Sequence, residues 1–308
     1  MTTAFVLSGG ASLGAIQVGM LQALVDHGIA PDLLVGTSAG ALNAAFVAGH
    51  GATVAGVSAL DEVWGQLRTR SLFPLHPRQA LSAFAGRKSA VCSDRGLRNL
   101  LHQHLLFDDL EDAPIPLLVV ATDLLTGREV PLQTGDAHRA VLASCAIPGI
   151  FPSVALDGMA LVDGGLANNT AVSQAVMAGA EEIYVLPSGY ACALPEPPRS
   201  PLGAVTHALT ILMHQRLIAD VALYAADVDL IVLPPPCPLR ISPANFGRAQ
   251  ELISAAYDSA TASLSEDGGR RPRPERLIAM HTHSKPTHSP ASCGVRSRHC
   301  HQTPHDTG

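Results

Sequence analysis

Hydrophobic positions along the chain alternate between short continuous runs and longer stretches with helical spacing. The continuous apolar runs cover residues 4–7, 33–35, 117–122, 160–162, 183–186 and 230–233. Apolar residues three or four positions apart cover residues 13–28, 54–67, 202–226 and 245–264. Strands that alternate with helices predict an α/β fold, in which a mostly parallel sheet carries helices on both faces.

Composition divides the chain into a body and a tail. With 308 residues, 47% hydrophobic and 15% charged, the chain is long enough for a sizeable core and is not disordered as a whole. Residues 1–265 carry 13 basic and 22 acidic side chains, whereas residues 266–308 carry 7 and 4, with six histidines among Pro, Ser, Thr and Arg. We therefore expect one domain over 1–265 and a disordered tail over 266–308. Residues 73–88 have no clear period, and we interpret them as a mobile cap.

Charge and targeting signals narrow the class of protein. A net charge of −6 argues against nucleic acid as the main partner. The first apolar run has no basic residue before it and glycines directly after it, which is not typical of a secretory signal. No uncharged apolar stretch reaches the roughly 18 residues that a membrane span needs. Six widely spaced cysteines indicate free thiols. We expect a cytoplasmic protein with at most a peripheral contact with membranes.

Five small residues connect the second predicted strand to the next helix, Gly36-Thr37-Ser38-Ala39-Gly40. This G-x-S-x-G pattern is typical of a nucleophile elbow, a sharp turn that exposes the central side chain. Ser38 would lie at the helix N-terminus, where the unpaired N–H groups favour developing negative charge. The alternative is a tight connection without chemistry, but the flanking strand and helix favour Ser38 as a nucleophile.

A glycine-rich loop follows the first predicted strand and opens the first helix, Gly9-Gly10-Ala11-Ser12-Leu13-Gly14. A dinucleotide-binding loop needs glycine at the position of Ala11 and an acidic residue at the end of the second strand, which here ends in Gly36-Thr37-Ser38. An oxyanion hole fits better. The carboxyl ends of parallel strands share one edge of a sheet, which brings the N–H groups of this loop toward Ser38.

A serine nucleophile needs a base, and the best candidate is an aspartate. His207 and His214 both fall on a predicted helix, and neither ends a strand. Asp163 ends the strand 160–162 and precedes Gly164-Gly165, so its carboxylate is expected at the same edge of the sheet. A desolvated carboxylate within hydrogen-bond reach of serine can act as a base near neutral pH. A role in stabilising its own turn stays open for Asp163, and Asp123 is a rival carboxylate whose position favours capping.

These three motifs, in this order, resemble the patatin-like phospholipase family over roughly residues 3–190. A fourth segment, residues 143–152, is similar to the loop that precedes the aspartate motif in that family. The resemblance implies a three-layer α/β/α fold that hydrolyses acyl esters of lipids with a Ser-Asp dyad. It implies no histidine in the dyad, no metal and no cofactor.

Carried over position by position, the resemblance makes Ser38 the nucleophile and Asp163 the general base. The backbone N–H groups of Gly9, Gly10 and Ala11 would form the oxyanion hole. The motifs are completed by Gly14, Gly36, Gly40, Gly164 and Gly165. The implied function is a serine esterase of the phospholipase A or lysophospholipase type, acting in lipid degradation through an acyl-enzyme.

Two residues depart from the family pattern. The family loop usually has a third glycine and a basic residue where this chain has Ala11 and Leu13. These departures keep one alternative open, a catalytically weak patatin-fold domain that binds lipid or protein. A nucleotide-binding module is a second alternative.

Two pairs of histidines and one apolar helical stripe are expected to have no functional role. The pairs His102/His104 and His281/His283 lack the three or four ligands of a zinc site, so we expect solvated side chains. A helical stripe of Leu209, Leu212, Met213 and Leu217 is expected to pack in the core rather than to contact lipid.

Overall fold

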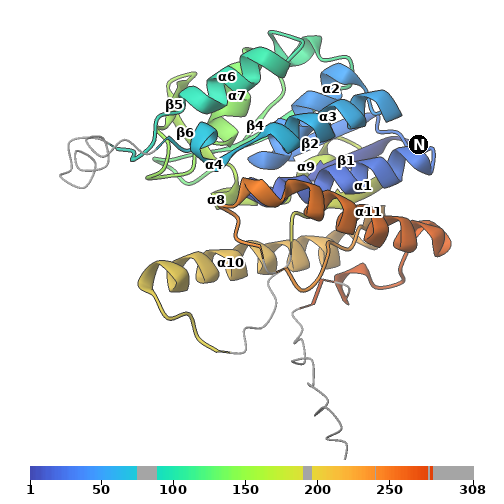
Figure 1. Ribbon diagram of the computed structural model, residues 1–308. Coiled ribbons are helices and arrows are strands. Elements are labelled where there is room, and N and C mark those ends of the chain that lie inside the picture. Colours follow the sequence, from blue (N-terminus) through green and yellow to red (C-terminus); the bar gives the residue numbers. More distant parts are fainter. Residues whose placement is uncertain (75–88, 190–195, 240, 277, 280–308) are drawn as a thin grey trace, which may run out of the picture.

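The computed structural model describes residues 1–74, 89–189, 196–239, 241–276 and 278–279 (Figure 1). The predicted mobile cap therefore lies largely outside the described residues. The strands are β1 (Thr3–Leu7), β2 (Leu33–Thr37), β3 (Leu117–Asp123), β4 (Glu129–Leu132), β5 (Val154–Leu156), β6 (Met159–Asp163), β7 (Glu182–Leu186) and β8 (Asp229–Val232). They form one sheet in the order β5-β6-β3-β2-β1-β7-β8, and β4 also pairs with β3.

The sheet is parallel where the chain alternates strand and helix. The five neighbouring strands β3, β2, β1, β7 and β8 all pair in parallel. The strands β4, β5 and β6 pair antiparallel at one end of the sheet. The hydrophobic pattern does not distinguish parallel from antiparallel strands. The length of the connection does, because antiparallel neighbours can be joined by a short turn, whereas parallel neighbours need a longer crossover. The predicted mostly parallel sheet is confirmed, with this antiparallel end as an addition.

Helices cover both faces of the sheet. The helices are α1 (Ala15–Asp26), α2 (Ala39–His50), α3 (Val54–Gln66), α4 (Thr69–Leu72), α6 (Arg95–His104), α7 (Ala137–Ser144), α8 (Gly165–Asn168), α9 (Val172–Met177), α10 (Pro201–Tyr224) and α11 (Ala249–Ser265). In Figure 1, α10 runs along the lower side of the molecule, and α2 and α3 lie on the opposite side.

Two apolar clusters divide the interior. Alternation along β1 sends Phe5 and Leu7 into the cluster that α1, α2, α3, α6, α7 and α11 share, and Ala4 and Val6 into the cluster that α9 and α10 share. Strands that are buried on both faces read as continuous apolar runs, which is the pattern in the sequence. The three-layer α/β/α fold is confirmed.

The strands β2 and β6 point at each other along one side of β3. Thr37, at the end of β2, pairs with Val120 of β3. Asp163, at the end of β6, pairs with the next residue, Ala121, in antiparallel register. The strand β4 occupies the opposite side of β3. The two strands therefore end against each other, and this head-on meeting brings Ser38 and Asp163 together.

The chain beyond residue 265 continues to pack on the body. Arg270 forms ion pairs with Glu182 and Asp229, and Ile278 is fully buried in the apolar cluster between the sheet and α10. The described part of the predicted tail is thus packed against the sheet, so the ordered region passes the boundary expected at residue 265. Residues 280–308 lie outside the described residues, and their disorder stays a prediction. Among the described residues, no helix combines the length and the apolar composition needed to cross a membrane.

Candidate active site

Ser38 occupies a strained turn between β2 and α2. Its φ of 54° lies in the left-handed region, which costs a residue other than glycine about 1–2 kcal/mol. The turn brings backbone segments very close together: a Cβ at Gly40 would lie 2.2 Å from the Leu7 carbonyl oxygen, and a Cβ at Gly36 would lie 2.6 Å from the Cα of Ala41. The glycines at both ends of the motif are therefore required for this geometry, which is the one expected of a nucleophile elbow.

The Ser38 hydroxyl contacts the carboxylate of Asp163. Ser38 Oγ donates a hydrogen bond of 2.6 Å to Asp163 Oδ2, and the Gly165 N–H donates to Asp163 Oδ1 at 2.8 Å. Burial raises the pKa of Asp163 to about 6, although the hydrogen bonds from Ser38 and Gly165 oppose that rise. Asp163 is therefore ionised at neutral pH and is still basic enough to accept a proton.

Ser144 and Cys145 fix the backbone of Ser38. The sequence pattern alone predicts no role for either residue. The Ser144 hydroxyl accepts the Ser38 N–H at 2.8 Å and donates to the Val120 carbonyl at 2.6 Å. The Cys145 thiol donates to the Ser38 carbonyl at 3.2 Å. Burial, together with the nearby charge of Asp163, raises the pKa of the Cys145 thiol well above its ordinary value, so the group keeps its proton. Both peptide groups of the strained turn are thus anchored by α7 and the residue after it.

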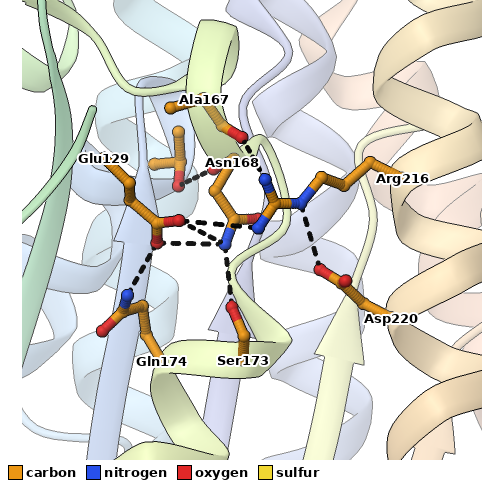
Figure 2. Close-up of polar contacts among 8 residues, drawn as sticks. Glu129, Ala167, Asn168, Ser173, Gln174, Arg216 and Asp220 are labelled. Carbon is orange, nitrogen blue, oxygen red and sulfur yellow. Dashed lines mark hydrogen bonds and ion pairs between the residues drawn. The ribbon is translucent and has the colours of Figure 1, made fainter. Parts of the chain in front are cut away.

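A polar network holds the turn that follows Asp163. The Asn168 carbonyl accepts a hydrogen bond from Thr37 Oγ1 at 3.1 Å, which ties α8 to the residue before Ser38. The Asn168 side chain donates to Glu129 at 3.0 Å and to Ser173 at 3.0 Å (Figure 2). Arg216 of α10 donates to the Ala167 carbonyl at 2.8 Å. Residues from β4, α9 and α10 therefore support the aspartate motif from the side of the sheet opposite α2.

The three N–H groups that the resemblance predicts as oxyanion donors differ in their hydrogen bonds. The Gly9 N–H donates to the Asn169 carbonyl at 3.0 Å, so it is already engaged and does not fit the predicted role. The N–H groups of Gly10 and Ala11 have no acceptor among the described residues. Ala11 lines the same cavity as Ser38, and its φ of 51° lies in the left-handed region that glycine adopts without strain.

An apolar cavity extends from Ser38 beneath α3, α4 and α6. Its walls include side chains such as Leu42, Phe46, Trp64, Leu101 and Phe151. The His104 ring also lines it, and burial together with the nearby His50 lowers the pKa of His104, so the ring is neutral at neutral pH. A cavity of this composition suits a hydrocarbon chain far better than a polar ligand.

In the part of the chain that the structure describes, Asp123, His207 and His214, the other candidate bases in the sequence, make no hydrogen bond to Ser38. The carboxylate of Asp123 accepts hydrogen bonds from the Leu125 N–H and the Thr126 hydroxyl, so it caps the turn between β3 and β4 as expected. His207 and His214 lie on α10. Among the described residues, no three His, Cys, Asp or Glu side chains converge as metal ligands would.

A sequence model of the family described as patatin-like phospholipase matches residues 5–176, more than half of the chain. The chain belongs to the patatin-like phospholipase family. The match contains the glycine loop, the elbow and the aspartate motif. Together with the contact between Ser38 and Asp163, membership of this family argues against the nucleotide-binding alternative.

Three relatives match this chain over part of their own length. The chain is 30% identical over 200 residues to the lysophospholipase NTE1 of Scheffersomyces stipitis, a match that covers 60% of this chain and 12% of that protein. It is 28% identical over 194 residues to patatin-like phospholipase domain-containing protein 7 of Rattus norvegicus, covering 60% and 13%. An uncharacterized NTE family protein of Mycobacterium tuberculosis is 32% identical over 168 residues, covering 53% and 42%. The match therefore covers less than half the length of each relative.

Two solved structures align with most of this chain at low sequence identity. VipD from Legionella pneumophila aligns with 86% of this chain and 66% of its own, at 15% identity and a TM-score of 0.45. The type III effector protein ExoU aligns with 86% and 53%, at 16% identity and a TM-score of 0.40.

Proposed function

We propose that this protein is a serine hydrolase that cleaves acyl esters of lipids through a Ser38-Asp163 dyad and an acyl-enzyme. The observation that carries the proposal is the 2.6 Å hydrogen bond from Ser38 to a buried carboxylate, made at a strained elbow that opens onto an apolar cavity. Membership of the patatin-like phospholipase family supports it.

In the first half of the reaction, Ser38 Oγ attacks the ester carbonyl carbon while its proton passes to Asp163 Oδ2. The resulting oxyanion accepts hydrogen bonds from the N–H groups of Gly10 and Ala11. The bond to the leaving oxygen then breaks, and that oxygen takes the proton from Asp163. An alcohol leaves, and the acyl group stays on Ser38.

In the second half, Asp163 accepts a proton from water, and the hydroxide attacks the acyl-enzyme. The same N–H groups stabilise the second oxyanion. Collapse of this intermediate releases a carboxylic acid, and the proton returns from Asp163 to Ser38 Oγ. The environment of Asp163 suits both steps, because a carboxylate whose pKa is raised to about 6 is a stronger base than an ordinary aspartate.

The apolar cavity supports a lipid acyl chain as the group transferred. Leu42 and Phe46 follow Ser38 by one and two turns of α2, so the wall of the cavity begins next to the nucleophile. Burying a methylene group contributes about 0.8 kcal/mol, so a cavity of this kind favours long acyl chains over acetate. Leu13, at the position where the family usually has a basic residue, has a partly buried side chain that packs on the core.

We further propose a peripheral contact with membranes through the first half of α10. No charged residue occurs between Pro201 and Gln215, and the exposed fractions of Val205, Leu209 and Leu212 are 58%, 41% and 67%. Exposed apolar side chains on successive turns favour an interfacial position. The predicted core role of this stripe holds for Leu217 but not for Leu209 or Leu212. The unbridged, buried thiols of Cys92 and Cys145 support a cytoplasmic location.

Sedimentation with vesicles tests the membrane contact. The variant Leu209→Glu/Leu212→Glu should lose binding to phosphatidylcholine vesicles, because it replaces two exposed apolar side chains with carboxylates. Leu223→Glu, in the last turn of α10 and about as exposed as Leu212, is the control and should bind like the wild type. Equal binding by the wild type and the double variant would contradict the proposed contact.

A hydrolysis panel tests the proposed reaction. We expect the wild type to hydrolyse p-nitrophenyl esters, phospholipids or lysophospholipids and to react with a fluorophosphonate probe. Ser38→Ala should lose both, and Asp163→Asn should lose hydrolysis. Ser263→Ala removes a buried hydroxyl on α11, away from the dyad, and is the control. A folded wild type that neither hydrolyses any ester nor reacts with the probe would favour the binding-domain alternative.

A further inference from the structure

A serine outside the family match lies against the glycine loop. Ser188 follows β7, beyond the matched residues 5–176, and only 6% of it is exposed. Its hydroxyl donates to the Gly9 carbonyl at 2.5 Å, and its N–H donates to Ser8 Oγ at 2.8 Å. The side chain of Asn169 donates to the same Gly9 carbonyl at 3.3 Å. The neighbouring Ser8 hydroxyl also donates to this carbonyl, at 3.3 Å. Three side chains therefore hold the carbonyl, and two of them, Asn169 and Ser188, come from segments far from Gly9 in the sequence.

The orientation of the Gly9 carbonyl determines where the Gly10 N–H points. The peptide bond between them is trans, so the carbonyl and the N–H project in opposite directions from one plane. With the carbonyl directed at Ser188 and Asn169, the Gly10 N–H is directed away from both. A Cβ on residue 10 would lie 2.0 Å from Ser188 Oγ, so the serine rests directly against the Cα of Gly10.

The neighbouring peptide group is fixed as well. The Gly9 N–H donates to the Asn169 carbonyl, and the Ser8 carbonyl accepts a hydrogen bond from Gln17 at 2.7 Å. Without the hydrogen bonds from Ser188 and Asn169, the Gly9-Gly10 peptide could rotate, since the glycines on both sides of it offer little steric resistance. A rotated peptide would direct a carbonyl oxygen, rather than an N–H, at a developing oxyanion.

We propose that Ser188 and Asn169 are positioning residues that hold the Gly9-Gly10 peptide with the Gly10 N–H available to the oxyanion. The inference rests on the proposed function. Neither side chain hydrogen-bonds to Ser38 or Asp163, so both act through the peptide alone. Their effect belongs to the transition state, in which the oxyanion exists, and not to the bound ester.

The test is a comparison of Ser188→Ala, Asn169→Ala and the double variant with the wild type and with Ser263→Ala. Loss of an oxyanion donor costs about 10²–10³ in rate, so we expect roughly a tenfold loss of kcat for each single variant and about a hundredfold loss for the double variant. KM and the pH midpoint of kcat/KM should stay at the wild-type values. Affinity for a trifluoromethyl ketone, which forms an oxyanion adduct with serine, should fall in parallel with kcat/KM, whereas affinity for a non-hydrolysable ether analogue should not change.

The outcomes separate the inference from the proposed function. An active wild type whose Ser188→Ala and Asn169→Ala variants keep full kcat would overturn the inference and leave the dyad intact. An equal loss of affinity for the ketone and the ether analogue would also overturn it, because that result indicates general distortion of the site. A wild type inactive on all esters would overturn the proposed function and this inference with it.

Discussion

The pKa of Asp163 makes a quantitative prediction about stability. Raising the pKa of a carboxyl from 3.8 to about 6 corresponds to about 3 kcal/mol of unfavourable free energy for the ionised group in the folded state. Below pH 3.8 the group is protonated in both states. Between pH 3.8 and about 6 the unfolded chain loses the proton while the folded chain keeps it, so the free energy of unfolding falls as the pH rises. Above about pH 6 the loss is complete.

The substitution Asp163→Asn removes this titration. We expect the free energy of unfolding of the variant, relative to wild type, to increase by about 3 kcal/mol between pH 3.5 and pH 7. Urea denaturation followed by circular dichroism at several pH values measures this difference, and other titrating groups cancel in it. A variant that is as stable as the wild type at pH 3.5 should therefore be about 3 kcal/mol more stable at pH 7, while lacking hydrolytic activity.

Asp123→Asn is the matched control with the opposite sign. Hydrogen bonds from Thr126 and Leu125 lower the pKa of Asp123, so its ionised form contributes stability above the ordinary pKa of aspartate that is lost as the pH falls through the lowered value. Its removal should therefore lower stability at neutral pH and have less effect at low pH. A difference between Asp163→Asn and wild type that does not change with pH would refute the reasoning.

Three other outcomes follow from the geometry of the site. Ala11→Gly should raise the free energy of unfolding by about 1 kcal/mol in urea denaturation, because it relieves the positive φ, whereas Ala44→Gly within α2 should lower it. Leu42→Trp should reduce kcat/KM for long-chain p-nitrophenyl esters by about tenfold or more and spare the acetate, because the larger ring fills the cavity beside Ser38. A plot of kcat/KM against pH should rise to a plateau with a midpoint near 6, since the base must be ionised. Unchanged stability in Ala11→Gly, unchanged chain-length preference in Leu42→Trp, or a flat pH profile would contradict the corresponding expectation.

Local sequence signals predict the layers of the fold and the two residues, Ser38 and Asp163, whose side chains meet in the structure. The elbow at Ser38 could be predicted because a sharp turn of small residues between strand and helix requires a specific local pattern. Asp163 was predicted from its position at the end of a strand. The predicted reason was incomplete, because β6 is antiparallel and meets β2 end to end instead of sharing its direction. Pairing direction depends on which strands become neighbours, and a single strand carries little information about that.

Contacts between distant segments could not be predicted from local patterns. Ser144 and Ser188 lie 106 residues from Ser38 and 179 residues from Gly9, and each acts through a single hydroxyl. The same holds for the Gly9 N–H, which was expected to be an oxyanion donor but is engaged by the Asn169 carbonyl. A serine after an apolar strand is common in proteins. Its role becomes visible only when the sheet order places β7 beside β1.

The most direct test of the central claim is to trap the acyl-enzyme and locate the acyl group. The wild type is mixed with a long-chain p-nitrophenyl ester, quenched in acid within the first turnover, digested and examined by mass spectrometry. We predict an acyl group on the peptide that contains Ser38, and no acylated peptide in Ser38→Ala. Hydrolysis that continues in Ser38→Ala at the wild-type rate, with no acyl group on Ser38 in the wild type, would contradict the account.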